Sequence, residues 1–79
     1  MKIHFIYSDG CKECKKMRKV ITECLYNHEL IEINSESDEA IDFAVANNIT
    51  DIPACFMEGK LTQGSKFDEQ LIRQTLCQK

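Results

Sequence analysis

The first apolar segment of the chain has the two-residue period of a β-strand. Residues 2–7 carry apolar side chains at both parities, as expected for a strand that is covered on both faces. One face takes Ile3, Phe5 and Tyr7, and the other takes Ile6. The pattern therefore predicts that residues 2–7 form a central strand.

The next segment changes to the period of an α-helix. The residues Ser8-Asp9-Gly10 interrupt the strand, and apolar positions then recur at intervals of three and four. These positions are Cys14, Met17, Val20, Ile21, Cys24, Leu25 and His28. We expect an amphipathic helix over about residues 12–27, closed by His28.

A second strand and a second helix follow. Residues 30–34 read as a short strand, and the serine and aspartate spacing in residues 35–38 suits a helix N-cap. The inward face of this helix is predicted from Ile41, Ala44, Val45 and Ile49. The helix should stop near residues 47–48, because Pro53 requires an extended approach.

The last third of the chain predicts a hairpin and a helix. Strands over 54–58 and 61–63 flank Gly59-Lys60 closely enough to form a β-hairpin. The final helix should turn inward the residues Leu71, Ile72, Thr75 and Leu76. The resulting order is βαβαββα.

This order predicts an α/β fold in a single domain that covers residues 1–79. A strand, helix and strand in succession imply a right-handed parallel crossover, and the hairpin adds antiparallel strands. We expect a mixed four-stranded sheet flanked by three helices, with helices on both faces.

Composition narrows the classes of partner. The net charge of -3 gives no general attraction to nucleic acid or anionic lipid. The first apolar run is too short to cross a bilayer, and we see no targeting segment, which favours a cytoplasmic protein. A monomer without nucleic-acid or membrane partners is the expectation.

The chain contains five cysteines, an odd number, and only Cys11 and Cys14 are closely spaced. This is not the pattern of a secreted disulfide scaffold. Cys24 falls on the apolar face of the first helix and Cys55 lies in a hairpin strand, so both are predicted core residues. Cys77 lies off the apolar row of the last helix and should be exposed, where adventitious dimerisation is the expected reaction.

The CxxC segment is the strongest candidate for chemistry. It lies where the central strand ends and a helix begins, so Cys11 should sit at the helix N-terminus and Cys14 one turn inside. Unpaired N–H groups and the helix dipole favour a thiolate at Cys11. We expect Cys11 to attack a partner disulfide and Cys14 to resolve the mixed disulfide. The flanking Gly10 and Lys12 are candidate substrate contacts.

The strand–CxxC–helix opening, with Ile52-Pro53 just before a hairpin, resembles the thioredoxin-like superfamily, and the length resembles its small glutaredoxin-type members. The resemblance covers essentially the whole chain. It implies a dithiol-disulfide oxidoreductase whose Pro53 is cis and whose Ile52 and Pro53 contact the substrate. Its partners would be protein or small-molecule disulfides and a reductase or glutathione.

The sequence departs from both main branches of that superfamily. It has neither the Gly-Pro dipeptide and preceding Trp of thioredoxins nor the Pro-Tyr dipeptide of many glutaredoxins. By resemblance, Gly64-Ser65 with Asp68 stand nearest to the glutathione-binding turn, and Asp51 precedes the Ile-Pro pair. Glutathione is thus a candidate reductant, with no bound cofactor and no metal expected.

Two other functions remain open on sequence. A CxxC in a loop between strand and helix also binds Cu(I) or half of a zinc site, so a copper or zinc carrier is the main rival. The element order and Asp9, two residues before the first cysteine, differ from common copper carriers. The third reading is a thioredoxin-fold module that holds a peptide without turnover.

Overall fold

The sheet is built around β1 (Lys2–Tyr7) in this computed structural model, which describes residues 1–77. β1 pairs in parallel with β2 (Glu29–Asn34) and antiparallel with β3 (Ala54–Met57). β4 (Lys60–Gln63) pairs antiparallel with β3, which gives the strand order β2-β1-β3-β4. The predicted βαβαββα order and mixed four-stranded sheet are confirmed.

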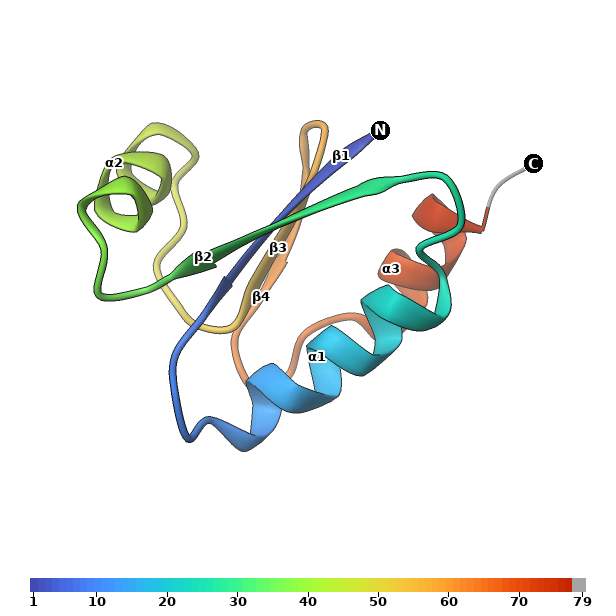
Figure 1. Cartoon of the computed structure of the whole chain (residues 1–79), viewed down its shortest axis with the longest axis horizontal. Coiled ribbons are helices and arrows are strands. Elements are labelled where there is room, and N and C mark those ends of the chain that lie inside the picture. Colours follow the sequence, from blue (N-terminus) through green and yellow to red (C-terminus); the bar gives the residue numbers. More distant parts are fainter. Residues whose placement is uncertain (78–79) are drawn as a thin grey trace.

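Helices cover both faces of the sheet, as predicted (Figure 1). α1 (Lys12–Glu23) and α3 (Glu69–Leu76) pack together on one face, and α2 (Asp38–Ala46) lies on the other. The helix caps follow the sequence, because Ser37 accepts a hydrogen bond from the Ala40 N–H and starts α2. None of the helices in residues 1–77 is long and apolar enough to span a membrane.

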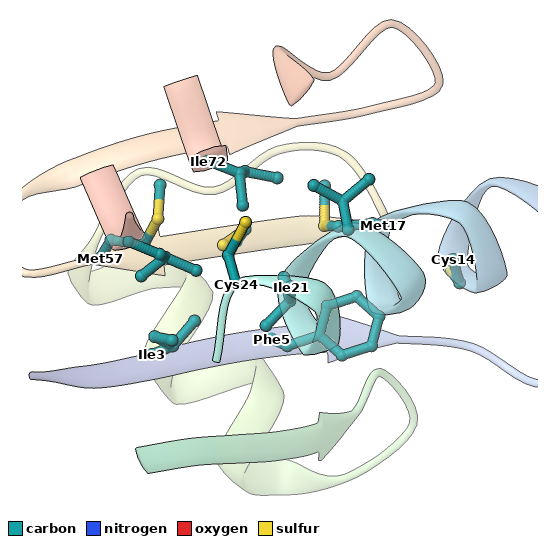
Figure 2. Close-up of a cluster of buried hydrophobic side chains, with 11 residues drawn as sticks. Ile3, Phe5, Cys14, Met17, Ile21, Cys24, Met57 and Ile72 are labelled. Atoms are coloured by element: carbon teal, nitrogen blue, oxygen red, sulfur yellow. The ribbon is translucent and has the colours of Figure 1, made fainter. Parts of the chain in front are cut away.

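The two faces of β1 contribute to two separate hydrophobic clusters. The larger lies between the sheet and the α1–α3 pair, and Figure 2 shows part of it. Its buried members are Ile3, Phe5, Cys14, Met17, Val20, Ile21, Cys24, Cys55, Met57, Ile72 and Leu76. The smaller lies under α2 and contains Ile6, Ile33, Ala40, Ile49 and Ala54. Cys24 and Cys55 are therefore core residues, as predicted.

The first helix is shorter than predicted. It ends at Glu23, with Cys24 as its C-cap, and not near residue 27. The following residues form a turn in which Tyr26 has a φ of 43° and the N–H of His28 donates to the carbonyl of Leu25 over 2.8 Å. The chain leaves the helix there because β2 must begin beside the start of β1, where Lys2 pairs with Glu29. Leu25 and His28 keep the helical spacing in the sequence, but they lie in the turn after α1 and not in the helix.

The predicted inward face of α2 is partly wrong. Ile41 and Val45 are 57% and 77% exposed, whereas Ala40 is buried and Ala44 is packed against the smaller cluster. Phe43 fixes the orientation of the helix, because its ring stacks on the His4 ring at 4.5 Å between centroids. His4 thus faces α2, and Ile41 is turned toward solvent.

The hairpin and the last helix differ little from prediction. The turn lies at Glu58-Gly59, one residue earlier than expected, and both residues have positive φ values of 47° and 92°. In α3, the residues Ile72, Thr75 and Leu76 are buried and Leu71 packs against the larger cluster, as predicted. Cys77 is the C-cap of this helix and is exposed, as expected.

Candidate functional site

Cys11 lies at the corner where β1 ends and α1 begins. The chain turns through Gly10, whose φ of +75° is a left-handed conformation that residues with a Cβ rarely adopt. Cys11 has an extended backbone and is itself the N-cap of α1. Its Sγ accepts a hydrogen bond from the backbone N–H of Cys14 over 3.1 Å. The first cysteine therefore caps the helix as a serine would in other proteins.

This capping geometry favours negative charge on Cys11. An N–H donor binds a thiolate more strongly than a neutral thiol, and the unpaired N–H groups of the first helical turn add the positive end of the helix dipole. Cys11 is also only half-buried and lines a cavity, so an incoming disulfide can reach it. The corner supplies both conditions that a nucleophilic cysteine needs.

Cys14 has the opposite environment. It is only 2% exposed and belongs to the larger hydrophobic cluster. Burial raises the pKa of the Cys14 thiol, and the adjacent Cys11 raises it further, while hydrogen bonds from Ser8 act in the lowering direction. The two thiols of the CxxC segment therefore differ in access, as the sequence predicts from the apolar face of α1.

A shallow cavity of about 310 Å³ opens at this corner. It is lined by Tyr7, Ser8, Asp9, Gly10, Cys11, Cys14, Lys15 and Arg18. The guanidinium of Arg18 lies 4.9 Å from the centre of the Tyr7 ring and pairs with Glu32 at 2.7 Å. Both cysteines thus line a space that also carries two cationic side chains and one carboxylate.

The Ile52-Pro53 segment lies next to the same corner. β3 runs antiparallel to β1 and pairs Ala54 with Ile6, so Pro53 comes beside the end of β1. The Ile52-Pro53 peptide bond is cis, as the family resemblance implied. Pro53 is buried, whereas Ile52 is half-buried and contacts both hydrophobic clusters. Ile52 and Cys11 both pack against the larger cluster, although Ile52 does not line the cavity that contains the two cysteines.

Gly64, which follows β4, is hydrogen-bonded to the Ile52-Pro53 segment. Its N–H donates to the carbonyl of Pro53 over 2.8 Å, and the carboxylate of Asp51 lies against its Cα. The other oxygen of Asp51 accepts the N–H of Ile52 over 2.8 Å. Asp51 therefore fills the space beside the turn that the sequence suggested for glutathione.

The predicted contact residues fall into two groups. Gly10, Cys11 and Cys14 line one cavity, and Ile52, Pro53 and Gly64 form a connected segment beside it. Lys12 and Ser65 are exposed and do not line that cavity. They remain candidate contacts only for a substrate that covers more of the surface.

Sequence reasoning missed two residues of the site. In the sequence pattern Ser8 only interrupts the strand, yet hydrogen bonding from Ser8 acts to lower the pKa of the Cys14 thiol. Arg18 belongs to no motif of the sequence, although its position four residues after Cys14 places it one helical turn farther on the same face. That spacing was the available signal for Arg18, and for Ser8 the sequence offered none.

Within the described part of the chain, no three histidine, cysteine or carboxylate side chains are grouped so that they could hold a metal ion. Cys11 and Cys14 supply two sulfurs at the corner, and in residues 1–77 no third side chain of that kind is grouped with them to bind the same ion. Four ligands are the usual complement of a structural zinc site. The geometry at this corner is therefore that of a dithiol and not of a complete zinc site.

Comparisons with known proteins agree with this geometry. A family model described as Thioredoxin domain matches residues 1–76. A mutant thioredoxin from Halobacterium salinarum NRC-1 superimposes with a TM-score of 0.68 at 20% identity, covering 95% of this chain and 70% of that one. The oxidised form of mitochondrial thioredoxin 3 from Saccharomyces cerevisiae gives a TM-score of 0.64 at 18% identity, covering 96% and 76%. No curated protein sequence matches the chain.

Proposed function

This chain belongs to the thioredoxin family, and from that membership we propose that it is a thiol-disulfide oxidoreductase that reduces partner disulfides through Cys11 and Cys14. Family membership supports a thiol redox function in general. The observation that carries the finer proposal is the cap of α1, where the Sγ of the half-buried Cys11 accepts the N–H of Cys14 over 3.1 Å. The substrates would be disulfides in proteins or small molecules.

In the first proposed step, the Cys11 thiolate attacks one sulfur of the partner disulfide. A mixed disulfide forms between Cys11 and the partner, and the other partner sulfur leaves as a thiolate. The hydrogen bond from Cys14 and the helix N-terminus stabilise the attacking anion before the reaction. Ile52, in the segment that leads into β3 near the end of β1, would contact the partner chain during this step.

In the second proposed step, Cys14 loses its proton and attacks Cys11 Sγ. The Cys11–Cys14 disulfide forms, and the second partner sulfur leaves as a thiol after taking up a proton. Burial raises the pKa of Cys14, which keeps this thiol protonated until the mixed disulfide has formed. β1 carries no acidic side chain that could accept the proton of Cys14. Water that enters through the cavity would therefore accept it.

The oxidised protein must then be reduced by a second partner. We propose either a protein reductase or glutathione as the electron donor, and a monomer working in the cytoplasm without nucleic-acid or membrane partners. The Asp51 carboxylate beside Gly64 would oppose the carboxylates of glutathione. A comparison of the two donors at equal reducing power would decide between them.

The test is a redox titration of Cys11 and Cys14 in dithiothreitol buffers, read by mass spectrometry after alkylation and repeated with metal chelated. We expect a reversible two-electron couple between roughly -180 and -280 mV. Cys14→Ser should accumulate a stable mixed disulfide with a model substrate, and Cys11→Ser should not. Failure to form an intramolecular disulfide, with tight stoichiometric metal in its place, would favour the carrier function.

A further inference from the structure

A second pair of cysteines lies at the other end of α1. Cys24 is the C-cap of α1, and Cys77 is the C-cap of α3. The two helices pack on the same face of the sheet, and both end on the right-hand side of Figure 1. Cys24 is 2% exposed, whereas Cys77 is exposed, so the pair repeats the contrast of a reachable and a buried thiol.

Side chains that flank the two cysteines bind each other. Arg73, one turn before Cys77, donates to Glu23 Oε1 over 2.9 Å, and its Nη1 lies 3.9 Å from the Sγ of Cys24. On the following turn, Nε2 of His28 lies 2.9 Å from the carbonyl oxygen of Leu76. The ends of α1 and α3 are therefore held together on both sides of the cysteines.

The surroundings of Cys24 keep its thiol protonated. Burial raises the pKa of Cys24, and the neighbouring Cys77 thiol raises it further, while the Arg73 guanidinium acts in the lowering direction. The same Cys77 thiol raises the pKa of the exposed Tyr26 hydroxyl. Arg73 thus reaches the Cys24 thiol from the end of α3 that Cys77 caps.

We propose that Cys24 and Cys77 form a second thiol-disulfide site, which a small disulfide oxidises to an intramolecular cross-link between the ends of α1 and α3. The exposed Cys77 attacks the small disulfide as a thiolate, forms a mixed disulfide and releases one thiolate. Cys24 then gives up its proton and attacks Cys77 Sγ, which releases the second small thiol. Two protein thiols are oxidised, and one small disulfide is reduced to two thiols.

This site is distinct from the CxxC corner. Cys24 lies 13 residues after Cys11 along one helix and its cap, which corresponds to a separation of roughly 20 Å. Figure 2 shows Cys14 near the start of α1, well apart from Cys24, which lies among Met57 and Ile72. The two pairs cannot exchange electrons directly within one folded molecule. The second couple would therefore respond to the surrounding thiol pool independently of the proposed reductase activity.

The experiment uses the full chain with Cys11→Ser and Cys14→Ser, which keeps Cys24, Cys55 and Cys77. The protein is equilibrated in glutathione redox buffers, unfolded and alkylated. The expected oxidised product is a monomer with one alkylated thiol, at Cys55, and a linked peptide pair containing Cys24 and Cys77. Dithiothreitol should restore three alkylated thiols. The unchanged chain, mapped by peptides, gives the same readout if the double variant does not fold.

Matched variants separate this cross-link from other oxidation products. Cys55→Ala in the same background should leave the Cys24–Cys77 link intact, and Cys77→Ser should abolish it. Oxidation should also raise the urea midpoint of the protein, and Cys77→Ser should remove that shift. A lasting glutathione adduct on Cys77, a Cys77–Cys77 dimer, a link through Cys55 or three thiols that stay alkylatable would each overturn the proposal.

Discussion

The carboxylate of Asp51 occupies the position that a side chain at Gly64 would take. A Cβ built on Gly64 would stand 2.7 Å from Oδ2 of Asp51, and Gly64 has a φ of +85°. The same carboxylate accepts a hydrogen bond from the N–H of Ile52, and the N–H of Gly64 donates to the carbonyl of Pro53. This contact joins the segment before β3 to the end of β4.

Gly64→Ala should therefore destabilise the protein through backbone strain and through the clash with Asp51. We expect the free energy of unfolding to fall by about 2–3 kcal/mol, measured by urea denaturation of the reduced protein. Gly59→Ala is the matched control, because Gly59 has a φ of +92° but no atom within 4 Å of the added Cβ. It should cost about 1 kcal/mol from strain alone.

The Asp51→Ala background tests the clash directly. Gly64→Ala should cost about as much as Gly59→Ala once the carboxylate is absent, because only the strained φ remains. Equal costs of Gly64→Ala with and without Asp51 would show that the carboxylate moves away freely.

The buried thiol of Cys55 should make stability depend on alkaline pH. Burial raises the pKa of Cys55 from 9.0 to about 12. Between these values the unfolded chain has lost a proton that the folded chain keeps, so the free energy of unfolding falls as pH rises. The contribution is complete below about pH 9 and declines by up to about 1.4 kcal/mol per pH unit above it.

Urea denaturation in reducing buffer from about pH 8 to about 10.5 measures this slope. Cys55→Ala removes the titrating group and should give a shallower slope over the same range, although its stability at neutral pH will be lower because of the cavity. The two proteins are compared by the slope of the free energy of unfolding against pH. The cavity lowers that free energy equally at every pH, so it does not change the slope. Identical slopes in the two proteins would contradict a protonated Cys55.

Arg18 should favour anionic disulfides at the CxxC corner. It lines the cavity beside Cys11, although its charge is partly balanced by Glu32 at 2.7 Å. Arg18→Gln should lower kcat/KM for oxidised glutathione by roughly two- to fivefold and should leave a neutral hydroxyethyl disulfide nearly unchanged. Added salt should shrink the difference, since the charges are exposed.

Lys60→Gln is the charge-matched control, because Lys60 is exposed and lies at the start of β4, away from the cavity-lining residues. It should leave the ratio of the two substrates unchanged. If Arg18→Gln lowers kcat/KM for both disulfides equally, Arg18 acts on the structure of the corner and not through its charge.

Asp68 should stabilise the protein as the N-cap of α3. Its Oδ1 accepts the N–H of Leu71 over 3.0 Å. Asp68→Ala should lower the free energy of unfolding by about 1 kcal/mol, whereas Asp68→Asn keeps a capping oxygen and should cost less. Urea denaturation checks both variants, and equal losses would show that the cap depends on the charge and not on the oxygen acceptor.

Local pattern was sufficient to predict much of the fold and the centre of the site. The two-residue period of β1, the helical period after Cys11 and the glycine in the hairpin turn each depend on neighbouring residues. They predicted the element order correctly, and they placed Cys11 at a helix start with Cys14 buried behind it. The same patterns misjudged the end of α1 and the face of α2.

The amino-acid sequence by itself determined the order of elements and the position of the CxxC segment, because each follows from side-chain periodicity and turn chemistry over a few residues. Only the tertiary structure decided that α1 stops at Glu23, that Asp51 packs against Gly64 and that Cys24 meets the end of α3. These relationships join segments that are far apart in the chain, and they depend on how the strands and helices pack. Local periodicity carries no information about which distant residue will fill a given space.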